Sequence, residues 1–192
     1  EYRAEWIDAL LRDASLALPD RRFAVRGMQL GDLGRAEMLP YLSFSKLREY
    51  ACRSKLNLVI TRKAHASVFA SSSSRPFELA SMGACMVCSP YEGIETWFEP
   101  DKELVVVHSA QEAVERYTWL LTHEDARRSM GQAARTRLLK EHTFRHRARQ
   151  VKRCADDLVE NGAELCDCHG VPPGLNLASG SELRLLWCSP LL

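Results

Sequence analysis

SRPFELASMGACMVCS, residues 74–89, is the stretch that decides the fold, because it joins a helix start to a buried strand. The serines that lead into it favour a loop, Pro76 suits the first helical position, and Gly83 suits the end of a short helix. The apolar run Ala84 to Cys88 then predicts a strand. A loop entering a helix N-terminus presents free N–H groups and the positive end of the helix dipole. The stretch therefore predicts a diphosphate site beside Glu78, in the first turn of the helix.

Strands alternate with helices along most of the chain, which predicts a doubly wound, Rossmann-like α/β fold around a parallel sheet. The predicted helices cover residues 3–17, 43–54, 76–82, 94–98, 110–121, 124–140 and 144–159. The predicted strands cover residues 22–26, 56–61, 84–88 and 103–108, and residues 32–38 and 65–74 are predicted to be loops. We expect strands 56–61 and 84–88 to be parallel neighbours. Such sheets bind ligands beyond the carboxyl ends of their strands. The loops 71–75 and 91–95 therefore flank the predicted crevice.

The chain of 192 residues divides into a lobe and a tail. Residues 1–160 carry the alternating pattern and have enough interior for one core. Residues 161–192 are dominated by Gly, Pro, Ser and Cys, which predicts either disorder or packing on a part that is absent. The pattern at Glu1 is already helical, so we expect a first strand to lie upstream.

The motif at residues 75–84, RPFELASMGA, follows the pattern R-x-F-E-x-x-x-x-G-A of CgeB-like proteins in the group 1 glycosyl transferases. Glu78 lies five residues before Gly83 and a hydrophobic strand, which is the spacing of the nucleotide-sugar site in the wider family. The resemblance continues through residues 93–95, 102–106 and 135–147. The chain thus resembles the C-terminal lobe of a retaining glycosyltransferase with the GT-B fold, over roughly residues 20–150.

This resemblance implies that residues 1–160 bind a nucleotide-diphosphate sugar as donor substrate, with no metal and no cofactor. An upstream N-terminal lobe would hold the unknown acceptor of a hexosyl transfer, so we expect the isolated chain to be inactive. Arg75 is the predicted catalytic residue, because it would stabilise diphosphate charge together with the N–H groups of Phe77 and Glu78. The residues expected to bind the substrate are Ser73, Ser74, Phe77, Glu78, Gly93, Ile94 and Glu95, with Glu78 on the ribose hydroxyls.

Several features leave alternatives open. The wider family carries a second glutamate where this chain has Ala70, so the lobe could be an inactive module that binds a nucleotide sugar or regulates. A nucleotide-sugar epimerase with the same fold would need acidic and histidine catalysts, and the sequence offers no such set. Glu78 could simply complement the helix dipole. Arg75 could clamp a phosphate or pair with Glu78 or Glu99 on the surface.

The seven cysteines, an odd number, do not form a disulfide framework and favour a reducing, cytoplasmic compartment. Cys85 and Cys88 have CxxC spacing in a predicted strand, where residues three apart face opposite ways and cannot share a metal. We expect both to be buried core residues. The cluster Cys166-Asp167-Cys168-His169 has too few neighbours for a closed zinc site.

The net charge of +1 describes a balanced chain, yet residues 127–153 hold eight Arg and two Lys against one acid, Glu141. These residues lie on amphipathic helices with no interleaved aromatic platform beyond Phe144, which argues against nucleic acid. A solvated helical face is the first expectation. Peripheral contact with acidic lipid headgroups is the second, because polybasic segments gain about 1 kcal/mol per residue near an anionic surface.

Overall fold

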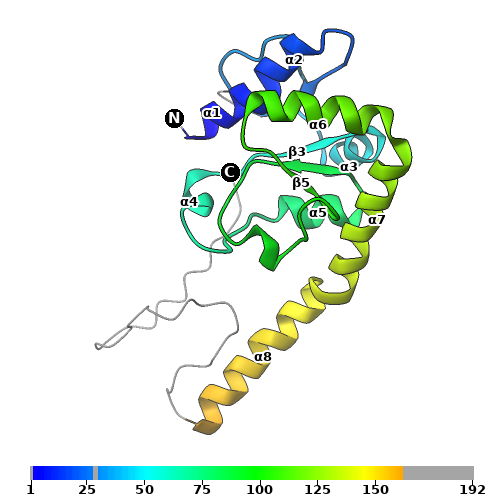
Figure 1. The fold of residues 1–192 in the computed structure, drawn as a ribbon. Helices are drawn as coiled ribbons and strands as arrows, with labels where there is room; N and C mark the ends of the chain where they lie inside the picture. Colours follow the sequence, from blue (N-terminus) through cyan, green and yellow to red (C-terminus); the bar gives the residue numbers. More distant parts are fainter. Residues whose placement is uncertain (1, 28–29, 162–192) are drawn as a thin grey trace.

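A computed structural model describes residues 2–27 and 30–161 of the chain (Figure 1). The predicted tail at residues 161–192 lies outside this part, apart from its first residue, which ends the last helix. The helices are α1 (Tyr2–Ile7), η1 (Asp8–Asp13), α2 (Ala14–Ala17), α3 (Phe44–Arg53), α4 (Lys63–Ala66), α5 (Arg75–Ser81), η2 (Ile94–Thr96), α6 (Ala110–Thr122), α7 (Glu124–Glu141) and α8 (Phe144–Asn161). The strands are β1 (Ala24–Val25), β2 (Glu37–Met38), β3 (Asn57–Val59), β4 (Met86–Cys88) and β5 (Val105–Val106).

The main sheet is parallel, in the order β3-β4-β5, and β4 lies at its centre. Leu58 pairs with Val87, which confirms that segments 56–61 and 84–88 are parallel neighbours. Val87 pairs in turn with Val105 on β5. The alternation of strands and helices therefore gives the predicted Rossmann-like arrangement.

Helices cover both faces of the sheet (Figure 1). One hydrophobic cluster packs Met86 and Cys88 of β4 against α5, the η2 segment and α7. The other packs Cys85 and Val87 against η1 and α6. Because successive side chains of a strand point to opposite faces, one short strand contributes to both cores.

The buried hydroxyl of Tyr117 on α6 donates a hydrogen bond of 3.0 Å to the carbonyl oxygen of Leu10 on η1. A buried phenol needs such a partner. The middle of the predicted helix 3–17 is a π-helix, η1, and this bond joins it to α6. The contact fixes the first helix against the sheet.

Two predicted loops contain regular structure. Residues 32–38 end in β2, which pairs in parallel with β1 and forms a second, two-stranded sheet. Both residues of β2 are exposed, so no apolar alternation marks it. Residues 65–74 begin inside the four-residue helix α4, which buries no residue. Elements this short and exposed leave no hydrophobic period in a sequence.

Ser109 begins α6 as predicted, because its hydroxyl accepts from the Glu112 N–H at 3.1 Å. The Glu112 carboxylate reaches back one residue further than in a regular capping box, to the N–H of His108 at 2.8 Å. The fully buried face of α6 is Ala113, Tyr117 and Leu120. Ala110, Val114 and Leu121, which also repeat at helical spacing, are only half-buried.

Three arginines in the basic region 127–153 are bound to other groups and at least partly buried, which corrects the first expectation for them. Arg127 is buried and donates to the carbonyl oxygen of Leu120. Arg137 pairs with the buried carboxylate of Glu103 at 2.6 Å. Arg147 bonds to His142 at the end of α7. These contacts hold α7 and α8 to the body of the lobe.

Helix α7 crosses the turn after α5 at an unusually close distance, and Gly131 permits it. A methyl group added to Gly131 would lie 2.1 Å from the carbonyl oxygen of Gly83. Gly83 itself has a φ of +69°, a conformation that L side chains rarely adopt. The family-like glycine at the end of α5 therefore serves the packing of α7 as well as the turn.

Replacing Gly131 with Ala tests this close approach by the sign of its effect. Helix propensity alone predicts a gain of about 0.8–1 kcal/mol. The clash with the Gly83 carbonyl instead predicts a loss of about 1–3 kcal/mol, the range for overpacking. Urea unfolding measures the difference, with the exposed Ser129→Ala on the same helix as control. A more stable Gly131→Ala chain would show that α7 does not approach the turn this closely.

Candidate functional site

The candidate site is built on the carboxyl ends of β3 and β4, which are tied together. The Ser89 N–H donates to the Val59 carbonyl oxygen at 3.0 Å. The Ser89 hydroxyl accepts from the Thr61 N–H at 3.0 Å, and both side chains are buried. The segments that follow the two strands therefore start side by side, at the edge where a parallel sheet of this kind binds ligands.

The predicted pair of loops, 71–75 and 91–95, is brought together by the structure. The Tyr91 hydroxyl donates to the Ser72 hydroxyl at 3.2 Å. Burial raises the pKa of Tyr91 to about 12, so the phenol stays protonated at neutral pH. His65 Nδ1 lies 2.9 Å from the Ser71 hydroxyl. Half-buried serines thus line the edge of the site and are held from both sides.

A second contact between the loops runs through Ala70, the position of the missing glutamate. The Ala70 N–H donates to the Glu92 carbonyl oxygen at 2.9 Å. The Ala70 carbonyl oxygen accepts from the Trp97 indole at 2.7 Å. Ala70 has a φ of +53°, which is uncommon for a residue other than glycine. Both polar groups of its backbone are therefore engaged, and they hold it in this conformation.

Gly93 allows the two loops to approach this closely, because a larger residue would clash with Ala70. Its φ is +81°, and a Cβ atom at this position would lie 2.5 Å from the Ala70 nitrogen. Gly93 is buried, and the Ile94 side chain beside it belongs to the hydrophobic core. Glu95 is exposed. Of these three predicted substrate-binding residues, only Glu95 presents a side chain to solvent.

The start of α5 brings the main predicted residues into direct contact. Arg75 Nη1 lies 3.2 Å from Glu78 Oε2. The Ser74 hydroxyl donates to Glu78 Oε1 at 2.8 Å. Both carboxylate oxygens of Glu78 are thus occupied, and Arg75 makes the surface pair that was the alternative to a phosphate clamp. Glu99, its other predicted partner, pairs with Lys102 at 2.8 Å.

The backbone at this helix start differs from the expectation in two respects. Pro76 occupies the second helical position, after Arg75. The Glu78 N–H already donates to the Ser74 carbonyl oxygen at 3.0 Å. Of the two N–H groups expected to meet a phosphate, that of Phe77 remains the candidate. Ser73 precedes them and is half-buried.

The Phe77 side chain points into the protein and joins an aromatic cluster. Its ring centroid lies 5.6 Å from that of Trp97, 5.4 Å from that of Phe98 and 5.8 Å from that of His142. Sequence reasoning missed Trp97 and His142, although the pattern offered a signal. Trp97 lies two residues after the predicted crevice loop 91–95, and His142 lies within the family-like run 135–147.

Cys85 and Cys88 are both buried, as predicted, and belong to opposite cores. Burial raises the pKa of the Cys85 thiol to about 11 and raises that of Cys88 as well. Among the described residues, no three His, Cys, Asp or Glu side chains gather in a way that could hold a metal ion. The predicted cluster at Cys166 to His169 lies outside the described residues.

Comparisons with known proteins identify the family and the fold. Residues 3–153 match the family model described as glycosyl transferase-like, so the chain belongs to this family. No curated protein matches the sequence closely enough to be counted as a relative. The fold, α/β and Rossmann-like, is that of GT-B glycosyltransferases. The chain therefore contains a glycosyltransferase-like domain.

Three solved structures illustrate the likeness. A sucrose-phosphate synthase from Thermosynechococcus elongatus has a TM-score of 0.64 at 15% identity, over 82% of this chain and 43% of that one. A glycosyltransferase from Rickettsia africae has a TM-score of 0.61 at 12% identity, over 84% of this chain and 46% of the Rickettsia chain. The C-terminal domain of a group 1 glycosyl transferase from Francisella tularensis has a TM-score of 0.52 at 15% identity, over 73% and 79%. The chain thus spans less than half the length of the first two.

Gly93→Ala tests the contact between the two loops. The change adds backbone strain at positive φ and a clash with Ala70, so it should lower the free energy of unfolding by clearly more than about 1 kcal/mol. Gly31→Ala is a matched control, because Gly31 has a φ of +73° and no atom within 4 Å of the added methyl. Denaturant unfolding measures both variants. Equal losses would show that the close approach to Ala70 contributes nothing.

Proposed function

We propose that this chain is the donor-binding, C-terminal lobe of a glycosyltransferase, nearest to the CgeB-like branch, and that it binds a nucleotide-diphosphate sugar. The observation that carries the proposal is the start of α5, where Glu78 contacts both Ser74 and Arg75. This helix start lies beyond the carboxyl ends of the strands, where parallel sheets of this kind bind ligands. The family match supports a transferase. The donor would lie between the loops 71–75 and 91–95.

In this proposal Glu78 and Arg75 exchange partners when the donor binds. The ribose hydroxyls replace Arg75 and Ser74 on the Glu78 carboxylate. Arg75 is then free to turn its planar guanidinium to the diphosphate. The exchange costs little because both side chains are partly exposed, and an exposed ion pair is worth about 0–1 kcal/mol.

The proposed reaction is a metal-independent hexosyl transfer to an acceptor held by an N-terminal lobe. Charge develops on the leaving diphosphate, and Arg75 with the Phe77 N–H would stabilise it in place of a cation. Ser73 and Ser74 can donate hydroxyl hydrogen bonds to the phosphate oxygens. Without a second lobe the acceptor is not held at reacting distance, so the isolated chain should transfer no sugar.

Glu78→Ala tests the donor site. Loss of charged hydrogen bonds to the ribose should weaken binding of UDP, ADP or GDP, whichever the wild-type chain binds, by about 1–3 kcal/mol. Backbone amide shifts at residues 73–78 during the titration locate the ligand. Glu124→Ala is the matched control, because Glu124 also lies in a first helical turn and pairs with an arginine four residues on.

Two results would overturn this assignment: nucleotide shifts that bypass residues 73–78, or equal affinity in the wild-type and Glu78→Ala chains. Circular dichroism should show that both variants keep the wild-type fold. The Ser74 and Arg75 contacts of Glu78 lie on the surface, so removing them should cost little stability.

The second candidate is an inactive module that binds a nucleotide sugar or has a regulatory role. Ala70 favours it, because a methyl group occupies the position of the wider family's second glutamate. Ala70 directly precedes the site loop, so an acid is absent at the edge of the proposed cleft. Donor turnover by a protein that includes both lobes separates an enzyme from this module.

A peripheral membrane contact through α8 is the third part of the proposal. Within residues 2–27 and 30–161, no helix is long and apolar enough to cross a membrane. Phe144 and Val151 lie seven residues apart on α8, hence on one face, and are 94% and 69% exposed. Arg145 and Lys152, each one position further along, flank this stripe. Such a helix suits the surface of an anionic bilayer.

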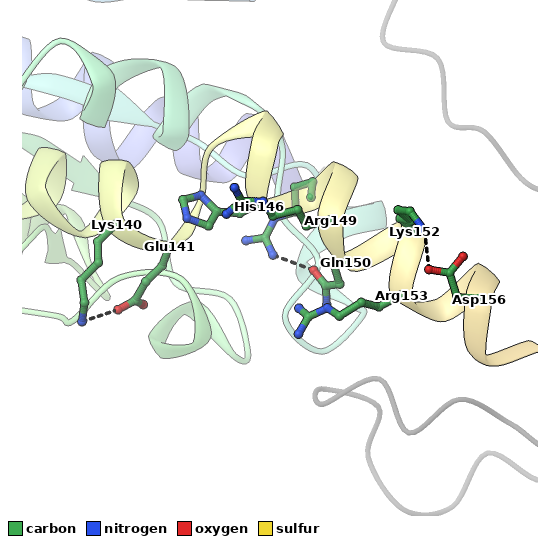
Figure 2. A pocket seen from close by; sticks show the side chains of 9 residues that line it. Lys140, Glu141, His146, Arg149, Gln150, Lys152, Arg153 and Asp156 are labelled. Atoms are coloured by element: carbon green, nitrogen blue, oxygen red, sulfur yellow. Dashed lines mark hydrogen bonds and ion pairs between the residues drawn. The ribbon is translucent and has the colours of Figure 1, made fainter.

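Basic side chains also surround a hollow of about 740 Å³ between the end of α7 and α8 (Figure 2). Lys140 and Lys152 are neutralised there by Glu141 and Asp156. Arg149 and Arg153 have no partner among the described residues, and they add positive potential at this end of the molecule. We place the protein in the cytoplasm, where its buried free thiols stay reduced.

Vesicle co-sedimentation tests the membrane contact. The wild-type chain should bind vesicles of phosphatidylcholine with phosphatidylserine, and bind less as salt rises, because salt screens the attraction. A Phe144→Ser, Val151→Ser chain should lose most of this binding. Leu16→Ser, which changes an exposed apolar residue on α2, should not. Equal binding to vesicles of phosphatidylcholine alone, or by both variants, would contradict the proposed contact.

A further inference from the structure

His142 lies at the joint between α7 and α8, where it is packed among aromatic rings. Its ring centroid lies 5.8 Å from that of Phe77, 5.7 Å from that of Trp97 and 6.2 Å from that of Phe98. Phe77 comes from α5, the helix that begins the candidate site. The joint therefore packs against the back of the site, and α8 projects from it, away from the sheet (Figure 1).

Arg147 attaches α8 to this joint by two contacts. Its Nη2 donates to His142 Nδ1 at 2.6 Å, and its guanidinium lies 5.2 Å from the centroid of the Trp97 ring. Arginine is only a donor, so Nδ1 of His142 must be the acceptor. The imidazole is then neutral, with its proton on Nε2. A cation over a tryptophan face is attracted to it.

The indole nitrogen of Trp97 reaches the start of the candidate site. Its indole N–H donates to the Ala70 carbonyl oxygen at 2.7 Å, and Ala70 leads into the serine loop at residues 71–74. The Trp97 ring thus contacts Arg147 near the start of α8, His142 at the joint, and Ala70, the residue before the serine loop. The indole is half-buried and has contacts on its face, its edges and its nitrogen.

We propose that Trp97 is a positioning residue that couples α8 to the serine loop at residues 71–74, and that protonation of His142 loosens this coupling. A proton on Nδ1 removes the acceptor that Arg147 uses, so the guanidinium must move. Its movement releases the face of Trp97 and alters the support of the Ala70 carbonyl. The effect of this coupling on donor binding rests on the proposed function, but the coupling itself does not.

Burial and the charges around His142 define the pH range in which its imidazole takes up a proton. Burial, followed by Arg147 on α8, lowers the pKa of His142 from 6.5, and Arg137 on α7 acts in the same direction. Glu141 on α7 and the Trp97 backbone favour the charged form and oppose the shift. The contacts from α5 and from Phe98 are uncharged rings. The neutral form is therefore favoured, and protonation falls below pH 6.5.

The lowered pKa of His142 makes the folded joint less stable at acidic pH. The unfolded chain binds a proton at His142 more readily than the folded chain. The contribution of the joint to stability is thus complete above about pH 6.5 and is lost as the pH falls through the lower, folded pKa. The loss is confined to the joint, so the sheet should stay folded while α8 and the serine loop change.

NMR titration from about pH 8 to pH 5, without nucleotide, tests the coupling across the range in which histidine changes charge. Every chain carries His65→Gln, so that no imidazole contacts Ser71 directly. In this parent chain the amides of residues 70–74, the Trp97 indole and the Arg147 amide should shift with one common midpoint below 6.5. His142→Asn keeps an acceptor for Arg147 and should abolish all three shifts. His108→Asn removes an exposed imidazole elsewhere and should change nothing.

Trp97→Phe separates coupling from simple proximity. It keeps an aromatic ring but removes the N–H, so residues 70–74 should stop responding while the Arg147 amide still titrates. Arg147→Gln should raise the midpoint toward 6.5 by removing the facing cation, which tests the joint even where Trp97→Phe folds poorly. The proposal is overturned if residues 70–74 do not titrate in the parent chain, or titrate unchanged in His142→Asn or Trp97→Phe. Because no nucleotide is present, failure of donor binding leaves these outcomes unaffected.

Discussion

The burial of β4 on both faces is the constraint on which the rest of the lobe depends. Met86, Val87 and Cys88 are at most 1% exposed, although the strand has only three residues. A parallel strand with no polar side chain must be covered by helices on both sides. Helices η1 and α6 supply one cover, and α5 and α7 supply the other. Function is thereby restricted to the ends of the strands and the segments that follow them.

This constraint explains why the candidate site consists of loops held together by hydrogen bonds. The serine loop has no hydrophobic side chain of its own that could fix it. Its neighbours fix it through the Glu92 carbonyl, the Trp97 indole and the Tyr91 hydroxyl. Each of these residues follows β4, whereas Ala70 follows β3. The geometry of the site thus depends on the register of two adjacent strands, which the bond between Ser89 and Thr61 maintains.

The electrostatics of the site are balanced before any ligand arrives. Glu78 is satisfied by Ser74 and Arg75, so neither charge is left without a partner. A ligand that offers both hydroxyls and phosphates can replace both sides of this pair at once. A simple anion would free Arg75 for itself but leave Glu78 without its cation. The proposed donor, a nucleotide-diphosphate sugar, carries both kinds of group.

The sequence could predict the long elements and the contact of α5 with β4, because their apolar residues repeat at helix or strand spacing over several turns. The Glu78 and Gly83 spacing could also be recognised, since helix ends leave local signals. β2 and α4 could not be predicted, because they are short and bury nothing. The sequence positions of Trp97 and His142 offered a signal, but the contacts that give them their roles could not be predicted. They arise from packing between residues 77, 97 and 142, which are far apart in the chain.

The bond between Tyr117 and Leu10 joins residues that are 107 positions apart, and this sets an order of events during folding. The first helix is synthesised before α6, its packing partner, so it emerges without this contact. Contacts of such long range form late, because closing the loop costs entropy before any burial offsets it. Until then the apolar face of the first helix is open to water and to other chains. Exposed apolar surface of this kind favours aggregation of the nascent chain until α6 is available.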